Sequence, residues 1–312
     1  MGGKDYHTKG TYIHPRTDQG FKILFGKESS KDIMIGFLND LFEEEDPVVD
    51  IQYLDKEVMP EPGIERAPIY DIHCITKCGK RFIVEMQNFP QPYFVDRSIY
   101  YATRAIAEQA KRGIWLYDYM PVYGVFICDF AIGGYEGNVR VDVDLCVRST
   151  GKQFSNKLCL TYIQLSEFTI TNPDDCKNDF ERWIYLLKYT EVMNTIPFMR
   201  EVFRRVENVG RVENLQGDDL IRYEQDLKAY RDYKAQMYYA ETEGMRRGME
   251  KGMEKGMEKG IEKGMEKGME KGIQQGRIGV IRQLISSGMR IEEIARSLSV
   301  TKGDIEKLLS VQ

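Results

Sequence analysis

The chain of 312 residues contains only three histidines, and its six cysteines form no set that could hold a zinc ion. Cys74 and Cys78 are four residues apart, but no second cysteine pair or histidine pair completes the four ligands of a structural zinc site. Four of the cysteines lie in apolar, strand-like runs. We therefore expect reduced, buried thiols, as in a cytoplasmic protein.

Long apolar runs are also missing. None comes close to the roughly 20 residues that a membrane-spanning helix needs. The first ten residues, MGGKDYHTKG, include no apolar stretch of the signal-peptide kind. The sequence thus predicts a cytoplasmic protein with no membrane partner.

An excess of positive charge is absent as well. The 44 Lys and Arg against 49 Asp and Glu give a net charge of -5, which argues against a protein that coats nucleic acid non-specifically. A local basic groove could still attract a phosphate backbone. With 42% apolar and 30% charged residues, the composition is that of an ordinary globular protein.

Three regions follow one another along the chain. Residues 1–243 mix helical and strand patterns and predict an α/β body. Residues 244–276 repeat a four-residue unit, and residues 277–312 predict a small helical module.

The pattern of the body predicts a mixed sheet flanked by helices. The stretch TDQGFKILFG opens a helix that Thr17 or Asp18 can cap. Strands are predicted at VVDIQYLDKEV, IYDIHCIT and RFIVEMQ, the last two forming an antiparallel hairpin through the turn KCGK. A long helix over 93–113, an apolar strand over 122–130, strands over 138–148 and 157–166, and helices from 173 to 243 complete the pattern.

Two carboxylates on the predicted hairpin suggest a metal site. Side chains alternate along a strand, so Glu85 and Gln87 share one face of RFIVEMQ. If the hairpin pairs through KCGK, Asp71 is a cross-strand or diagonal neighbour of Glu85. Carboxylates this close repel each other unless a proton or a cation intervenes, and Mg²⁺ takes such oxygen ligands. Solvent-facing positions on a one-sided sheet are the alternative.

The stretches around this hairpin resemble a known family. They are TDQGFKILFG, FLNDLF, IYDIHC, FIVEMQ, RSIYYATRAIAEQAKRG and PVYGVFICDF. In kind and order they are similar to the recombination-promoting nuclease (Rpn) family of transposase-like proteins, in the PD-(D/E)xK nuclease superfamily. The resemblance covers about residues 18–130 and continues more loosely to the C-terminus. It implies a restriction-endonuclease-like α/β core and a metal-dependent DNA endonuclease, using Mg²⁺ or Mn²⁺, that acts in recombination or transposition.

The resemblance also implies roles for individual residues. Asp71 and Glu85 would be the acidic metal ligands, and Gln87 would take the third catalytic position, where the superfamily pattern has lysine. The proline of that pattern does not directly precede Asp71, since Pro68 lies three residues earlier. The alternative function is a nuclease-fold protein that has lost turnover and serves as a DNA-binding or self-associating module.

Two helices could complete the site. Asp18 and Lys22 share a face of the first helix, where Asp18 would be a third metal ligand and Lys22 a DNA contact; an N-cap and a solvated charge are the alternatives. The long helix offers further DNA contacts: Arg97, Tyr101, Arg104 and Gln109. Packing of tyrosines on the sheet beside solvated arginines is the other interpretation. His73, beside Asp71, is expected to be structural.

The C-terminal regions leave alternatives open. In residues 244–276 a glycine recurs every fourth position, and each costs about 1 kcal/mol against alanine in a helix. This favours a marginal helix or a flexible spacer, with self-association through the helical region also open. Residues 277–312 resemble a helix-turn-helix, but they carry little net charge, so DNA contact and a packing or self-association module both remain.

Overall fold

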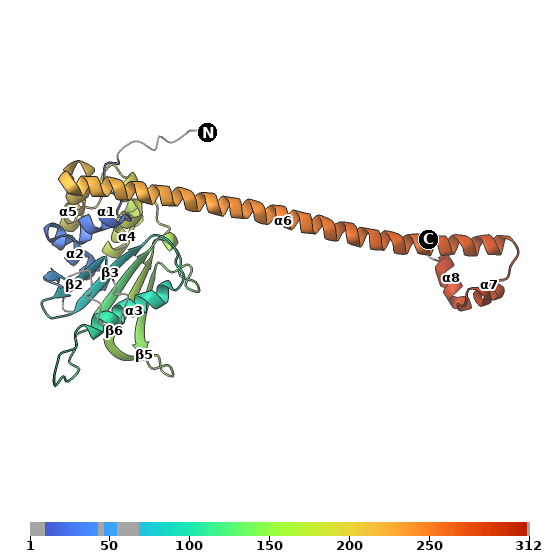
Figure 1. Ribbon diagram of the computed structural model, residues 1–312, viewed down its shortest axis with the longest axis horizontal. Coiled ribbons are helices and arrows are strands. Elements are labelled where there is room, and N and C mark those ends of the chain that lie inside the picture. Colours follow the sequence, from blue (N-terminus) through green and yellow to red (C-terminus); the bar gives the residue numbers. More distant parts are fainter. Residues whose placement is uncertain (1–9, 43–46, 55–68, 311–312) are drawn as a thin grey trace. The chain divides into compact units, whose positions relative to one another are not determined.

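A mixed β-sheet forms the centre of the computed structural model, which describes residues 10–42, 47–54 and 69–310 (Figure 1). Its strands lie in the order β1-β2-β3-β4-β6-β5. They are β1 (Ile51–Tyr53), β2 (Ile72–Thr76), β3 (Arg81–Gln87), β4 (Val122–Cys128), β5 (Arg140–Cys146) and β6 (Gln153–Gln164). β3, β4 and β6 are parallel to one another, and the remaining pairs are antiparallel. The wholly apolar β4 is buried along its length in the middle of the sheet, as its sequence predicts.

Helices cover both faces of this sheet. One face packs against α1 (Asp18–Phe25), α2 (Lys31–Phe42), α4 (Asp179–Tyr189) and α5 (Glu201–Gly210), and the other against α3 (Phe94–Ala107). Short 3-10 turns lie between them: η1 (Glu28–Ser30), η2 (Leu165–Glu167), η3 (Pro173–Asp175), η4 (Thr190–Val192) and η5 (Val212–Asn214). This is the mixed α/β sandwich expected of a PD-(D/E)xK fold.

Helix α1 shows how the sequence produces this packing. Thr17 caps the helix, since its hydroxyl accepts a hydrogen bond from the Gly20 N–H. Phe21, Leu24 and Phe25 fall on one face at helical spacing and are almost fully buried. Burial of each such side chain contributes about 2 kcal/mol, which fixes α1 against the sheet.

Three elements differ most from the sequence prediction. The strand expected over 48–58 is confined to β1, and its last four positions, like Pro68, lie outside the described residues. β6 begins at Gln153, earlier than expected. Helix α3 ends at Ala107 and not at Gly113. The physical reason is Gln109, whose amide binds both backbone groups of Met120 and turns the chain toward β4.

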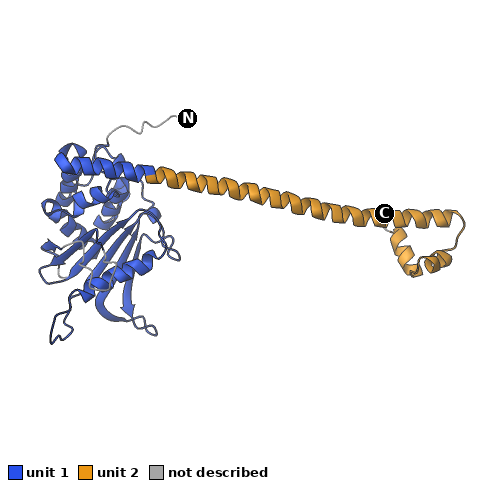
Figure 2. Ribbon diagram, in the orientation of Figure 1, with its two compact units in different colours: residues 1–232 blue, residues 233–312 orange. Residues whose placement is uncertain are grey.

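The chain divides into two compact units, residues 1–232 and 233–312 (Figure 2). The boundary lies inside α6 (Gly217–Ser286), ahead of position 243, where the sequence placed the end of the body. The tetrad repeat lies within α6. Of the two predicted alternatives, a helix and a flexible spacer, the structure contains the helix. In the second unit, α7 (Ile291–Ser297) and α8 (Lys302–Ser310) pack with the end of α6 around buried Ile281, Ile294 and Ile305. Across the described residues, no helix has the length and apolarity required to span a bilayer.

Candidate active site

The structure brings Asp71 and Glu85 together. Asp71 directly precedes β2, and Glu85 lies near the end of β3. The strand register pairs Ile72 with Val84, so Asp71 and Glu85 are the next opposed residues. The Asp71 N–H donates to Glu85 Oε1 over 2.9 Å, and the Met86 N–H donates to Asp71 Oδ2 over 3.0 Å. The antiparallel hairpin and the cross-strand position predicted from the sequence are both present.

The environment of Glu85 disfavours its negative charge. Its exposed fraction is only 7%. Burial raises the pKa of the Glu85 carboxyl well above its usual range, and the neighbouring Asp71 carboxylate raises it further. The Asp71 N–H and the charges of Arg97 and Lys22 oppose this effect. A buried carboxyl beside a half-buried carboxylate is stabilised by a shared proton or by a cation.

A hard divalent cation fits the donor set of this pair. Mg²⁺ is commonly held by one or two carboxylates, with water and substrate phosphate completing its shell. Within residues 10–42, 47–54 and 69–310, no group of three or more His, Cys, Asp or Glu is placed to hold a metal ion. The predicted third ligand, Asp18, instead pairs with Lys22 at 2.6 Å. The site can thus supply two protein carboxylates, and Asp18 does not extend the pair to three.

Gln87 is held between the sheet and α3. Its Oε1 accepts a hydrogen bond from Arg97 Nη2 over 2.5 Å, and its Nε2 donates to the Phe89 carbonyl over 3.0 Å. Arg97 is therefore joined to the neutral residue at the third position, and its charge also acts on Glu85. The neutral Gln87 side chain cannot supply the positive charge of a lysine at this position, but its contact with Arg97 brings a positive charge beside it.

The other predicted DNA contacts fall into two groups. Lys22 and Tyr101 interact with the carboxylate pair: the charge of Lys22 acts on Glu85, and the pKa of Tyr101 is raised by burial and by Glu85. The Arg97 guanidinium also lies 5.8 Å from the Tyr101 ring centre. Arg104 lies further along α3, and Gln109 closes the α3–β4 connection through Met120, so its amide has a structural role.

His73 lies on the same face of the hairpin as Asp71, two pairs further from its open end. It is 2% exposed, and its ring packs edge-on against Tyr70 at 4.8 Å. Burial, followed by the charge of Arg81, lowers the pKa of His73 to about 4. A buried neutral ring packed in this way agrees with the structural role expected of His73.

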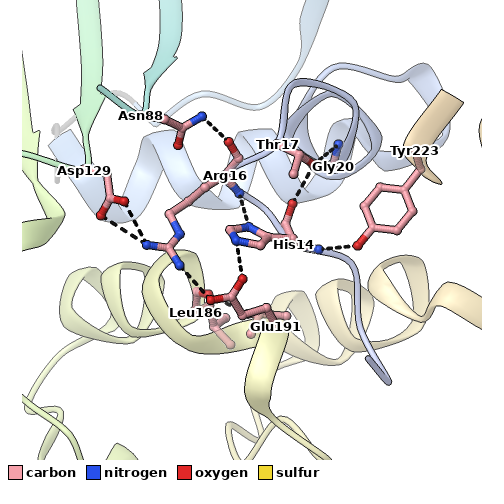
Figure 3. A network of polar contacts seen from close by, with 10 residues as sticks. His14, Arg16, Thr17, Gly20, Asn88, Asp129, Leu186, Glu191 and Tyr223 are labelled. Atoms are coloured by element: carbon pink, nitrogen blue, oxygen red, sulfur yellow. Dashed lines mark hydrogen bonds and ion pairs between the residues drawn. The ribbon is translucent and has the colours of Figure 1, made fainter. Parts of the chain in front are cut away.

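A network of buried and half-buried polar groups supports the same end of the sheet (Figure 3). Arg16 donates to both carboxylate oxygens of Asp129, over 3.0 and 3.1 Å, and to Glu191 over 2.8 Å. Its carbonyl accepts a hydrogen bond from the Asn88 side chain, the residue after Gln87. The His14 ring binds Glu191 through Nε2, and the His14 backbone N–H donates to the Tyr223 hydroxyl of α6. The network fixes the ends of β3 and β4 to the segment before α1 and to α6.

Sequence reasoning did not identify this network, although one signal was available. Asp129 directly follows the all-apolar β4, and charged residues after buried parallel strands gather at one edge of the sheet. The partners, Arg16 and Glu191, gave no such signal, because they are 113 and 62 residues away from Asp129.

Comparison with known proteins identifies the family of the chain. Residues 15–240 match the family described as PD-(D/E)XK nuclease family transposase. No curated protein and no solved structure gives a match. The matched residues include the strand hairpin with Asp71 and Glu85, as well as the α3 helix with Arg97. Because the match covers more than half of the sequence, the chain belongs to the PD-(D/E)XK nuclease family of transposases.

Proposed function

We propose that the chain is a metal-dependent DNA endonuclease that hydrolyses phosphodiester bonds during recombination or transposition. The observation that carries the proposal is the pair of the buried Glu85 and the half-buried Asp71, whose mutual repulsion a divalent cation would relieve. Family membership supports a nuclease acting on DNA. Mg²⁺ or Mn²⁺ is the proposed ion, since both take carboxylate oxygens.

Asp71 and Glu85 would hold the ion from adjacent strands. When bound, it would polarise a phosphodiester oxygen and lower the pKa of a coordinated water. The backbone hydrogen bonds from Asp71 and Met86 orient the two carboxylates before substrate arrives. Burial of Glu85 excludes water from one side of the pair and strengthens its interaction with any cation.

Arg97 would stabilise the negative charge that develops on the phosphate oxygens during cleavage. Gln87 is neutral, so its own role is to orient: its Oε1 holds Arg97, and one of its Nε2 hydrogens is bound to the Phe89 carbonyl. A guanidinium can donate to two phosphate oxygens at once. We therefore assign the role of phosphate-binding cation to Arg97 and the role of positioning residue to Gln87. Lys22, Tyr101 and Arg104 would contact the flanking strand.

Cleavage of supercoiled plasmid by the purified chain tests this function. Nicking is expected with Mg²⁺ or Mn²⁺ and not with EDTA, and the isosteric Glu85→Gln variant should be inactive. A folded wild-type chain that never cuts would favour the second candidate, a DNA-binding module without turnover. The neutral Gln87 motivates that alternative, and DNA binding without cleavage is its expected result.

We also propose that copies of the chain associate through the C-terminal helical region. In α6 the methionines and isoleucines of the tetrad repeat are more than half exposed, although an apolar row on a helix is usually covered. Sedimentation of the full chain beside a chain ending at residue 243 tests this association. We expect the full chain to sediment as an oligomer and the shorter chain as a monomer. If both chains sediment as monomers, the proposal is contradicted.

A further inference from the structure

One end of the sheet lies opposite the carboxylate pair. Because β3, β4 and β6 are parallel, their first residues meet at one end, whereas Glu85 lies near the last residues of β3. Three segments meet at this end: residues 77–81, 108–121 and 146–157. Figure 1 shows the α3–β4 and β5–β6 connections projecting there. We call these three segments the distal surface.

The distal surface is basic although the chain is acidic. It contains eight Lys and Arg but only two acidic residues, Glu108 and Asp118, in a chain of net charge -5. Arg81 pairs with Glu108 at 3.4 Å, and Lys111 lies 3.6 Å from Asp118. Arg112, Arg148 and Lys152 are exposed and form no ion pair within the described part of the chain. The positive charge of these three side chains is therefore available to an anionic partner.

Apolar side chains stand among these cations. Ile114 is 97% exposed, Leu116 is 85% exposed and Phe154 is 77% exposed. Isolated exposed apolar residues are common, but here two stand on the α3–β4 connection and a third, Phe154, stands at the start of β6 at the same end of the sheet. Several exposed apolar side chains at one place are typical of an interaction site.

The connection between α3 and β4 holds its tip in place. The Gln109 amide binds both backbone groups of Met120 across its base, over 2.9 and 3.1 Å. Lys157 donates to the Tyr119 carbonyl over 2.8 Å, so β6 braces the same loop. At the tip, Trp115 lies 4.8 Å from the Tyr117 ring and donates to Asp118. The structure thus presents the apolar tip on a fixed base.

We propose that the distal surface is a second DNA-binding surface, in which Arg112, Arg148 and Lys152 contact phosphates and the loop tip contacts sugars or bases. The proposal rests on DNA being the substrate of the proposed nuclease. Cations around exposed aromatic and apolar side chains match the two parts of a nucleic-acid strand, its phosphates and the flat faces of its bases. An acidic protein partner would match the cations alone.

The length of α3 allows one duplex to reach both surfaces. The helix has 14 residues, so it spans about 21 Å at 1.5 Å per residue. One turn of B-form DNA is about 34 Å long. Arg97 lies at the carboxylate pair, and Arg104 lies seven residues, or about two helical turns, further along α3. Lys111 and Arg112 follow at the distal end, so cations occur along the whole path. DNA held at the distal surface can therefore lie along α3 to the site of cleavage.

Binding of a fluorescein-labelled duplex to the full chain, measured by anisotropy in EDTA, tests this inference without any cleavage. The double variant Arg148→Glu/Lys152→Glu should bind about tenfold more weakly. Its slope of log affinity against log salt should fall by about 2, as expected for two lost phosphate contacts. The variant Ile114→Ser/Leu116→Ser should weaken binding about fivefold with an unchanged slope.

A matched control uses Lys177→Glu/Arg204→Glu, two exposed cations on the segments that cover the other face of the sheet. It changes the net charge equally and should keep the affinity within about twofold. Equal losses in the control and the distal variants would overturn the inference, as would a wild-type chain that does not bind DNA. Dependence on Arg148 and Lys152 for binding phosphatidylserine vesicles, with DNA binding unchanged, would overturn it in favour of a membrane surface. A chain that binds DNA through the distal surface but never cuts would contradict only the proposed catalysis.

Discussion

Asp71 and Glu85 are linked reciprocally across the β2–β3 hairpin. The Asp71 N–H donates to the Glu85 carboxylate, and the N–H of Met86, next to Glu85, donates to the Asp71 carboxylate. The two acidic groups are thereby fixed side by side, where their like negative charges repel each other.

Glu85→Gln should stabilise the protein without metal and abolish its response to metal. The amide keeps an oxygen that can accept from the Asp71 N–H, but it removes a buried charge beside a second carboxylate. At pH 7.5 in EDTA we expect the free energy of unfolding to rise by about 1 kcal/mol. Urea denaturation with and without Mg²⁺ measures both effects. An Mg²⁺ stabilisation equal to that of the wild type would exclude Glu85 as a ligand.

Arg97→Ala should lower the cleavage rate about 100-fold, the usual cost of losing one group that stabilises a transition state. Arg97→Lys should recover part of the rate, because it restores the charge but not the two-pronged geometry. Arg104→Ala serves as the control, since Arg104 has no contact with Gln87 and should mainly weaken substrate binding. Single-turnover cleavage at saturating DNA separates the two effects. Equal loss of rate in both alanine variants would contradict the special position of Arg97.

His73 should make the protein less stable in mild acid. Its pKa in the folded state is about 4 and its ordinary value is 6.5. The unfolded chain therefore takes up a proton first as the pH falls, so the contribution of His73 is fully present above pH 6.5 and is lost toward pH 4. The free energy of unfolding should fall by about 3 kcal/mol at most over this range.

The variant His73→Leu isolates this effect, since the His73 Nε2 has no hydrogen-bond partner among the described residues. The difference in unfolding free energy between wild type and variant should change between pH 6.5 and pH 4 and be flat above pH 7. A difference that does not depend on pH would show that His73 is not buried as a neutral ring.

The beginning of α6 should be indispensable to the first unit. Tyr223 is 3% exposed and accepts a hydrogen bond from the His14 N–H, and Asp226 accepts one from the Gln19 N–H at the start of α1. A chain ending at residue 243 keeps these contacts and should unfold cooperatively. A chain ending at residue 216 lacks them and should be digested rapidly by trypsin. Equal protease resistance of the two chains would contradict this role.

The sequence predicted the parts of the site that depend on local rules. The turn KCGK sets the hairpin, with Gly79 at a φ of 88° that few other residues adopt. Alternation along RFIVEMQ then places Glu85 and Gln87 on one face. Asp71 opposite Glu85 follows from the same register. These features follow from neighbours in the chain and from the period of a strand.

Features that depend on packing between distant segments were not predictable in this way. The hydrogen bond between Arg97 and Gln87 depends on how α3 crosses the sheet, and the pattern of α3 alone predicts only which face is apolar. The contacts of Arg16 with Asp129 join segments far apart in the sequence. The early end of α3 depends on a side chain, Gln109, that reaches across a loop to Met120.

Metal-dependent cleavage of supercoiled plasmid, comparing the wild type with Glu85→Gln, tests the central claim most directly. Both proteins would be assayed with Mg²⁺, with Mn²⁺ and with EDTA, after circular dichroism has established that both are folded. The account predicts nicked plasmid only for the wild type and only with a divalent ion. Cleavage by Glu85→Gln at the wild-type rate, or cleavage by the wild type in EDTA, would contradict it.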